Sequence, residues 1–398
     1  MSPRHSWRCC AGSSAPSPLR LASLWIGSFA FFLSFFVLVP VLPLYARDLG
    51  LSDARIGVVM AAFAVSSMLL RPWVGWASDR HGRRPLMIAG GVVFLLAPLG
   101  YALSAGLLGL TLTRLFHGAG MGLYPTAATA MAADLAPAAR RAEVLGIFGM
   151  AGSLALALGP AIGVALARAL GYAALFAIAT GVGIAGLALV VTVRESLAEP
   201  TATPLRWRET LSPSAALPSL LMLALMLSYG AVITFMPLHA DARALNPGVF
   251  FLVYALALTL VRQPAGKLSD RYGRAPVGAA GLVVVAAALL IVAFSGGLAG
   301  LIAAGLVYGI GHGIAQPALL AWSVDGVPAS QRGRAVGTFY TALELGIAIG
   351  AITAGITVSG VGFRTTFVTA AGVVLAAAGV AATAAWARPR GRRSAASR

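Results

Sequence analysis

A fifteen-residue phrase occurs twice in this sequence, and its repetition constrains the fold more than any other feature. It spans residues 71–85 and again 262–276, and eight of its positions hold the same residue. The identical positions lie 191 residues apart, and matches at this offset continue as far as Phe148 and Phe339. Each copy follows one long apolar run and precedes another, which indicates a charged hairpin between two membrane helices. The chain is therefore predicted to consist of two homologous halves.

The composition indicates an integral membrane protein. Of the 398 residues, 59% are hydrophobic and only 10% are charged, and the mean hydropathy is +0.87. Soluble domains carry charge on about a quarter of their residues. A membrane helix needs about 20 apolar residues. Twelve such runs are predicted, at 21–45, 54–76, 85–105, 107–132, 143–168, 171–193, 214–239, 247–268, 276–295, 298–322, 333–357 and 363–387. The expected fold is all-α, with twelve transmembrane helices in two pseudo-symmetric six-helix bundles.

The longest polar stretch separates the two sets of six runs. It divides the chain into an N-terminal tail, a first bundle, a linker, a second bundle and a basic tail, predicted at 1–20, 21–193, 194–213, 214–387 and 388–398. Of the 29 basic residues, 23 lie in the tails, the linker and alternate loops on one side of the membrane, or at helix ends there. Five lie on the other side, and Arg114 lies within a run. Because positive charge accumulates on the cytoplasmic side, both termini are expected in the cytoplasm.

Several classes of function are disfavoured by what the chain lacks. The net charge of +17 sits in short loops and tails between apolar runs, so no nucleic-acid partner is expected. The two cysteines, Cys9 and Cys10, are adjacent in a polar tail and cannot form a disulfide framework or a Cys-based metal site. No Gly-x4-Gly-Lys-Ser/Thr, His-Glu-x-x-His or Gly-x-Ser-x-Gly motif occurs. We therefore expect no cofactor, no metal and no enzymatic activity.

The duplicated phrase resembles a known family signature. The pattern Gly-x-x-Ser-Asp-Arg-x-Gly-Arg follows the second and the eighth apolar run. In combination with twelve spans in two related halves, it resembles the major facilitator superfamily, and within it the twelve-span drug/proton antiporters and related efflux permeases. The resemblance implies two bundles that rock about a central cavity in the cell's inner (plasma) membrane. It also implies a functional monomer whose partners are a small-molecule substrate, protons and the lipid bilayer.

The two hairpins contain the residues that this resemblance assigns to a cytoplasmic gate. They are Gly75, Asp79, Arg80, Gly82, Arg83 and Asp134 in the first half and Gly266, Asp270, Arg271, Gly273, Arg274 and Asp325 in the second. The first glycine of each set is expected to allow close helix approach, and the second to permit a tight turn. The resemblance implies that the acidic residues and the last arginine of each set form a latch that holds the outward-open state. The alternative is that these charges only enforce topology.

A second motif lies in the run at 107–132, where Arg114 precedes Gly118 and Gly120 as in the family's Arg-x-x-x-Gly-x-Gly pattern. An arginine within a membrane span costs roughly 2.5 to 3.5 kcal/mol on insertion scales, so it normally faces a protein interior or an aqueous cavity. We expect Arg114 to face the cavity and to be linked to proton movement. The alternative is that it snorkels to the outer surface.

A third motif lies in the run at 143–168 and resembles the antiporter motif of the family. Its matching residues are Gly146, Gly159, Pro160 and Gly163, and it departs from the pattern at Ala155 and Val164. Small residues with a proline predict a kinked, closely packed helix. Because this motif separates exporters from importers in the family, the resemblance implies export.

Glu344 is the one acidic residue predicted to lie deep in the membrane. Ten residues of helix place it about 15 Å beyond Arg334 at the membrane edge. A carboxyl group there is expected to load and release a proton, and Tyr340, one turn earlier, is expected to share its hydrogen bonds. The alternatives are a permanently protonated structural glutamate and direct pairing with a cationic substrate. Glu344 is thus the predicted principal proton or cation site.

Weaker signals come from His117, Tyr124 and Tyr229, which are also predicted to line the cavity or to titrate. The alternative for each is packing inside a bundle. The function expected from these features is a proton-coupled secondary transporter that exports a drug-like compound or a metabolite by alternating access. A proton symporter or importer on the same fold is the alternative. The sequence does not identify the substrate.

Overall fold

The computed structural model describes residues 18–137, 140–197, 212–325, 327–328 and 331–386. The predicted C-terminal tail, most of the predicted N-terminal tail and the middle of the predicted linker lie outside these residues. All regular secondary structure in the described ranges is helical. The elements are α1 (Pro18–Phe36), α2 (Val41–Asp48), α3 (Asp53–His81), α4 (Arg83–Leu103), α5 (Gly106–Leu135), α6 (Arg141–Thr192), the 3-10 helix η3 (Pro213–Ala215), α7 (Ala216–Asp241), α8 (Pro247–Tyr272), α9 (Arg274–Phe294), α10 (Gly297–Val324) and α11 (Arg332–Trp386).

The backbone turns between helices repeat at the same offset as the sequence. Seven of the described glycines have φ between 74° and 101°, a conformation that side-chain-bearing residues rarely adopt. Six of them form three pairs that lie 191 residues apart: Gly82 and Gly273, Gly106 and Gly297, Gly171 and Gly362. The two halves therefore share the positions of these turns as well as their signature residues.

The prediction of an all-α membrane protein is confirmed. Nine helical stretches of the described chain are long and apolar enough to cross a bilayer. The described residues form eleven α-helices instead of the twelve predicted, for two physical reasons. The first predicted span is interrupted between α1 and α2. In addition, α6 and α11, with 52 and 55 residues, each run through a non-helical glycine, Gly171 or Gly362, at the boundary predicted between two spans.

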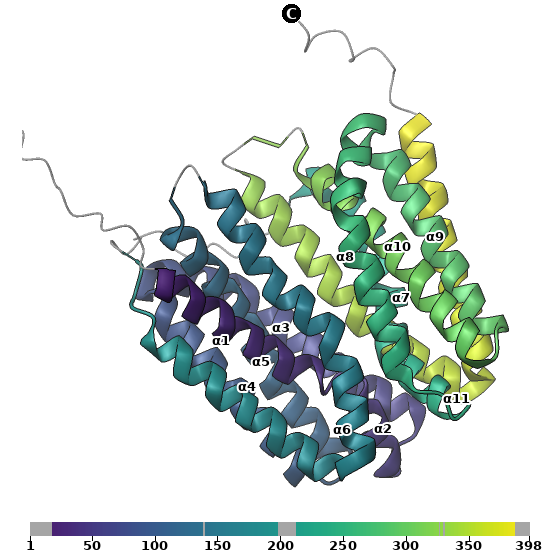
Figure 1. Ribbon diagram of the computed structural model, residues 1–398. Helices are drawn as coiled ribbons and strands as arrows, with labels where there is room; N and C mark the ends of the chain where they lie inside the picture. The colour runs from purple at the N-terminus through teal and green to yellow at the C-terminus, as the bar shows by residue number, and fades with distance from the viewer. Residues whose placement is uncertain (1–17, 138–139, 198–211, 326, 329–330, 387–398) are drawn as a thin grey trace, which may run out of the picture.

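The helices pack as two sets that lie side by side (Figure 1). Helices α1–α6 form the N-terminal half, and α7–α11 form the C-terminal half. The main contacts between the halves join α3 to α11 and α6 to α8. We call the end that carries the Gly82 and Gly273 turns the hairpin end. The opposite end, where α2 leads into α3 and α7 into α8, is the far end.

Candidate functional site

A buried ion pair joins the two halves in the middle of the molecule. Arg71 on α3 places Nη2 2.6 Å from Glu344 Oε1 on α11. The side chain of Glu344 is only 6% exposed, and that of Arg71 is 30% exposed. Ser67 donates a further hydrogen bond to the same carboxylate oxygen at 3.3 Å. The guanidinium of Arg71 also lies over the ring of Tyr340, 5.7 Å from its centroid.

The pair lies at a depth that suits a transport site. Glu344 is twelve residues from the start of α11, and Arg71 is ten residues from the end of α3. At 1.5 Å per residue both lie about 15 to 18 Å from the hairpin end, near the centre of a hydrocarbon layer about 30 Å thick. The sequence singled out Glu344 and Tyr340 here but missed Arg71. The available signal is that Arg71 lies ten residues inside α3, whereas the predicted run at 54–76 places it near a helix end.

A cavity of about 310 Å³ lies between the halves. The N-terminal half contributes apolar and small residues to its wall, including Phe32, Phe36, Gly152 and Ser153. The C-terminal half contributes the larger polar side chains, which are Tyr229, Tyr254, Arg262, His312 and Gln316. Tyr229, one of the residues predicted to line a cavity or to titrate, is on the wall of this one. The hydroxyl of Tyr254 lies 3.0 Å from His312 Nδ1, and Arg262 donates from Nη2 to Gln316 Oε1 at 3.0 Å.

Arg114 is placed inside the N-terminal half and is not among the residues that line this cavity. It is 3% exposed, and its guanidinium lies 4.6 Å from the ring centroid of Phe63 on α3. Its Nη2 donates a long bond of 3.5 Å to the carbonyl of Met60. Its Nε and Nη1 have no hydrogen-bond partner among the described residues. A buried guanidinium with so few acceptors is costly, which is typical of a functional position and not of packing alone.

His117 and Tyr124 also lie in the interior of the N-terminal half. The ring nitrogen Nδ1 of His117 is 2.9 Å from the hydroxyl of Tyr101, and the hydroxyl of Tyr124 is 3.0 Å from Ser28 Oγ. Tyr124 is 1% exposed and stacks on Phe31. Neither residue lines the central cavity. The packing alternative therefore describes their positions.

The hairpins assemble the charged groups that the family resemblance linked together. Arg83 contacts two carboxylates, Asp79 at 2.7 Å and Asp134 at 3.3 Å. In the second half Arg274 contacts Asp270 at 2.5 Å and Asp325 at 3.2 Å. The first cluster is better covered, since the side chain of Arg83 is 11% exposed and that of Arg274 is 25% exposed. Two of the predicted gate residues stay outside these clusters and lie over neighbouring aromatic rings: Arg80 over Trp76 and Arg271 over Tyr272.

Glu195, which the sequence placed only in the linker, covers the first cluster. Its carboxylate accepts bonds from the backbone N–H groups of Arg83 at 3.0 Å and Arg84 at 2.9 Å, at the start of α4. A carboxylate is favoured at this helix end by the exposed N–H groups and the helix dipole. Partial burial acts to raise the pKa of Glu195, but its backbone N–H donors together lower the pKa below its ordinary value. A Cβ at Gly82 would collide with this carboxylate, so the Gly82 turn and Glu195 fit each other.

Gly75 and Gly266, which the sequence predicted to allow close helix approach, make no such approach in the described conformation. A Cβ added at either position would meet no atom of the described residues within 4 Å, and the same holds at Gly146. The reason is that all three lie toward the hairpin end of the helices that face the other half. Gly159 and Gly163 of the antiporter motif are closely packed instead. They face Phe36 and Val37, where α1 ends, while Pro160 lies within α6.

The far end, in contrast, is closed by close contact between the halves. A Cβ at Gly57 on α3 would collide with the carbonyl of Ala351 on α11. A Cβ at Gly248 on α8 would lie 2.8 Å from Cα of Ala161 on α6. An ion pair between Arg168 and Asp241, at 3.2 Å, adds a cross-half contact at this end.

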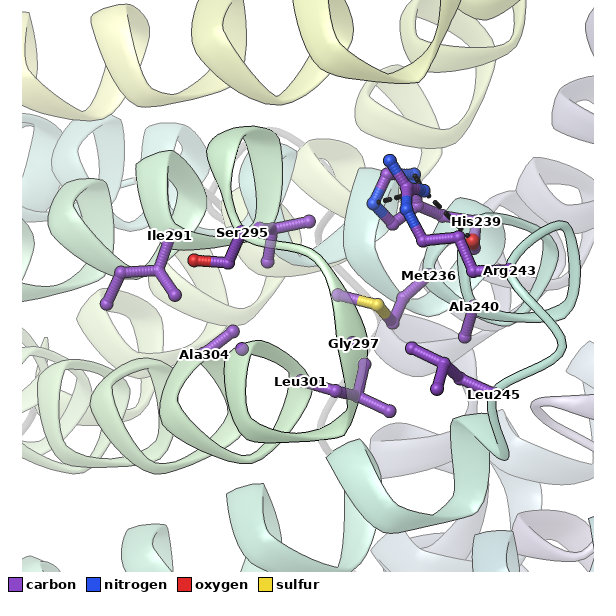
Figure 2. Close-up of a pocket in the computed structure, with 12 residues that line it drawn as sticks. Met236, His239, Ala240, Arg243, Leu245, Ile291, Ser295, Gly297, Leu301 and Ala304 are labelled. Carbon is purple, nitrogen blue, oxygen red and sulfur yellow. Dashed lines mark hydrogen bonds between the residues drawn. The ribbon is translucent and has the colours of Figure 1, made fainter.

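Two other voids do not have the properties of a substrate site. One lies in the C-terminal half between α7, α9 and α10, beside His239 and Arg243 (Figure 2), and its volume of about 20 Å³ is enough for about one water molecule. The other, of about 530 Å³, is lined by apolar side chains of α1, α5 and α6, such as Trp25 and Phe148, and offers no charged group to orient a ligand.

Comparison with known proteins identifies the family. The sequence profile of the Major Facilitator Superfamily matches residues 24–261 and 220–398. An uncharacterised MFS-type transporter of Methanocaldococcus jannaschii is 22% identical over 345 residues, which cover 83% of this chain and 89% of the relative. The quinolone resistance protein NorA of Staphylococcus aureus is 31% identical over 140 residues, but the match covers only 35% of this chain and 36% of NorA.

Solved structures show the same fold at low sequence identity. The human organic anion transporter MFSD10 matches 92% of this chain and 100% of its own, with a TM-score of 0.67 and 19% identity. A peptide transporter POT variant covers 92% of this chain and 94% of its own, with a TM-score of 0.78 and 17% identity. A variant of the nucleoside transporter NupG matches 92% of this chain and 99% of its own, with a TM-score of 0.79 and 14% identity.

These matches define a multi-span membrane transporter and not an enzyme. This chain belongs to the Major Facilitator Superfamily.

Proposed function

We propose that this protein is a proton-coupled secondary active transporter that exports a small organic molecule by alternating access. The observation that carries the proposal is the Arg71–Glu344 pair, a titratable carboxylate at mid-membrane depth held by an arginine of the other half. Breaking or forming this pair changes the energy of contact between the halves, so it can couple protonation to their relative motion. The partial similarity to NorA supports export.

The proposed architecture is twelve crossings in two six-helix bundles, 21–193 and 214–387, joined by the linker at 194–213. Reading α1 and α2 as one crossing, and α6 and α11 as two each, supports this number. The excess of basic residues at the hairpin end supports placing that end and both termini in the cytoplasm of a cell whose plasma membrane holds the protein.

We infer that the described conformation is open toward the cytoplasm. Gly57 and Gly248 are pressed against the opposite half at the far end, whereas a Cβ at Gly75 or Gly266, at the hairpin end, would meet no atom of the described residues within 4 Å. In this state Glu344 is ionised and paired with Arg71. In the outward-open state the pair separates and Glu344 takes up a proton from outside. Return to the inward-open state then delivers that proton to the cytoplasm, and the exported substrate moves in the opposite direction.

In this cycle the two hairpin clusters act as cytoplasmic latches, and Arg114 with His117 forms a second polar group inside the N-terminal bundle. The clusters around Arg83 and Arg274 sit where the hairpin ends would meet on closure. The buried guanidinium of Arg114, with Nε and Nη1 unpartnered, supports a role that changes its surroundings during transport.

A proton symporter or importer on the same fold is the second candidate, because the solved neighbours include peptide and nucleoside transporters. Everted membrane vesicles with an imposed proton gradient test the choice. Norfloxacin, a quinolone, is the first probe because of the similarity to NorA. Antiport predicts that a gradient acidic inside drives norfloxacin into the vesicles and that Glu344→Gln abolishes this uptake. Uptake driven only by the opposite gradient would show symport, and full gradient-driven uptake by Glu344→Gln would remove Glu344 from the mechanism.

A further inference from the structure

Arg262 is the repeat counterpart of Arg71, but none of the described residues gives it a carboxylate partner. Both arginines begin the duplicated phrase and lie 191 residues apart, Arg71 on α3 and Arg262 on α8. The position that corresponds to Glu344 in the other half is residue 153, on α6, and it holds a serine. The duplication has therefore kept the arginine in both halves and the acid in only one.

The structure preserves the geometry of this relation. Helix α8 packs against α6 as α3 packs against α11. The glycines Gly57 and Gly248, also 191 residues apart, press against α11 and α6 respectively. Arg262 and Ser153 line the same cavity, from α8 and α6. Ser153 thus stands where a carboxylate would meet Arg262, and its hydroxyl bonds instead to the carbonyl of Gly149 at 3.4 Å.

Arg262 presents an uncompensated positive charge to the cavity. Its only hydrogen bond among the described residues goes to the neutral amide of Gln316 at 3.0 Å. No acidic residue occurs among the described residues that line the cavity. Glu344, the residue expected to pair with a cationic substrate, is occupied by Arg71. Arg262 is exposed at the cavity wall, and the described residues that line the cavity supply no counter-charge.

We propose that the cavity binds amphiphilic organic anions whose acidic group pairs with Arg262 in the way that Glu344 pairs with Arg71. Arginine offers two parallel N–H donors to a carboxylate, and Gln316 beside it adds an amide donor. The apolar part of the ligand packs on Phe32 and Phe36, which the N-terminal half presents to the same cavity. This inference names the substrate class for the transporter proposed above and rests on that proposal.

The test is equilibrium binding to the purified full-length protein in detergent, without a proton gradient. The probes are 1-naphthoate, 1-naphthalenemethanol and 1-naphthylmethylammonium, which share an aromatic body and differ in charge. Binding is measured by calorimetry to the native protein and to Arg262→Gln, Ser153→Glu and Ser153→Gln. Ser153→Glu supplies the carboxylate missing from the repeat, and Ser153→Gln fills similar space without charge.

We expect native protein to bind 1-naphthoate at least tenfold more tightly than the alcohol or the ammonium. A charged hydrogen-bonded contact of this kind corresponds to roughly 10- to 100-fold in affinity. The variant Arg262→Gln should lose this preference for 1-naphthoate. The variant Ser153→Glu should bind 1-naphthoate at least tenfold more weakly than Ser153→Gln. The double variant Ser153→Glu with Arg262→Gln should prefer 1-naphthylmethylammonium.

Equal binding of the three probes, no binding of 1-naphthoate, or unchanged affinity in Arg262→Gln would overturn the proposal. If Ser153→Glu does not fold, the comparison of Arg262→Gln with native protein still decides. A failure of the proposed proton coupling can be distinguished from a failure of the anion site, because these binding measurements involve no gradient and leave Glu344 intact. Selective 1-naphthoate binding by a protein that shows no proton-driven flux would support the anion site and reject the coupling mechanism.

Discussion

Removing the Arg71–Glu344 pair should destabilise the described conformation by a measurable coupling energy. At an effective dielectric constant of about 20, unit charges 2.6 Å apart attract by about 6 kcal/mol. Desolvation of a carboxylate that is 6% exposed offsets several kcal/mol of this attraction. The 30% exposure of Arg71 screens the pair further. We therefore expect a net coupling of about 1 to 3 kcal/mol between the two side chains.

The two single variants should differ in cost. In Glu344→Gln the remaining arginine keeps the Tyr340 ring and partial hydration, whereas in Arg71→Gln the nearly buried carboxylate loses its counter-charge. Arg71→Gln should therefore be the more destabilising of the two near neutral pH. The assay is equilibrium unfolding in mixed micelles of a mild detergent and dodecyl sulfate, with both single variants and the double variant at pH 7.5.

A matched control is available within the N-terminal half. Arg47 and Asp53 form a pair at 2.9 Å, with side chains 33% and 25% exposed, and a pair of this kind is expected to contribute less than about 1 kcal/mol. The central pair does not contribute as expected if the effects of Arg71→Gln and Glu344→Gln on the free energy of unfolding are additive within about 0.5 kcal/mol. The same holds if their coupling energy is no larger than that of the control pair.

Three further predictions concern the two ends of the molecule. Gly75→Leu should leave this conformation intact and oppose closure of the hairpin end by about 1 to 3 kcal/mol, while Gly57→Leu should oppose closure of the far end. Distance measurements across the two ends should therefore show opposite shifts in the two variants. Equal shifts would contradict the assignment of the ends. Arg83→Gln should slow norfloxacin export more than Arg274→Gln, because Arg83 is the less exposed, with membrane insertion unchanged in both; the reverse order in vesicle assays would count against the cluster geometry. Because folding lowers the pKa of Glu195, its carboxylate stabilises the fold above its ordinary pKa of about 4.5, and this contribution is lost as the pH falls through the lowered value. The melting temperatures of native protein and Glu195→Gln should thus differ at pH 7 and converge as the pH falls below the lowered pKa of Glu195, and a constant difference would exclude this role for Glu195.

Much of the fold could be predicted because local signals determine it. The apolar runs predict helices by length alone, and the duplicated phrase predicts two related halves. The glycine turns at Gly171 and Gly362 lie at the predicted span boundaries, although the helices on either side continue through them without a gap. The break between α1 and α2 ends at Pro40, and this proline is a local signal for a kink within the first apolar run.

The candidate site could be predicted only in part. The depth of Glu344 follows from counting along one helix. Its contact with Arg71, 273 residues earlier in the chain, depends on how the halves pack, and no local pattern encodes that. The glycines of the hairpins mislead for a related reason. A motif can serve a contact in one conformation, and Gly75 has no such contact in the conformation described. The repeat offset did contain one usable signal. Ser153 occupies the position in the first half that corresponds to Glu344 in the second, which shows where the two halves differ in charge.

The central claim is that the Arg71–Glu344 pair belongs to the conformation closed at the far end. At equilibrium without substrate, protonation of Glu344 therefore favours the conformation closed at the hairpin end. Spin-label distances in lipid nanodiscs test it most directly, with Cys9 and Cys10 replaced by serine. Exposed positions suit both ends: His81 with Tyr272 at the hairpin end and Leu49 with Ala242 at the far end. Between pH 8 and pH 5 the far-end distance should lengthen and the hairpin distance should shorten.

In Glu344→Gln both distances should match the native values at pH 5, whatever the pH. Distances in the native protein that do not change with pH, or a full pH response in Glu344→Gln, would contradict the account.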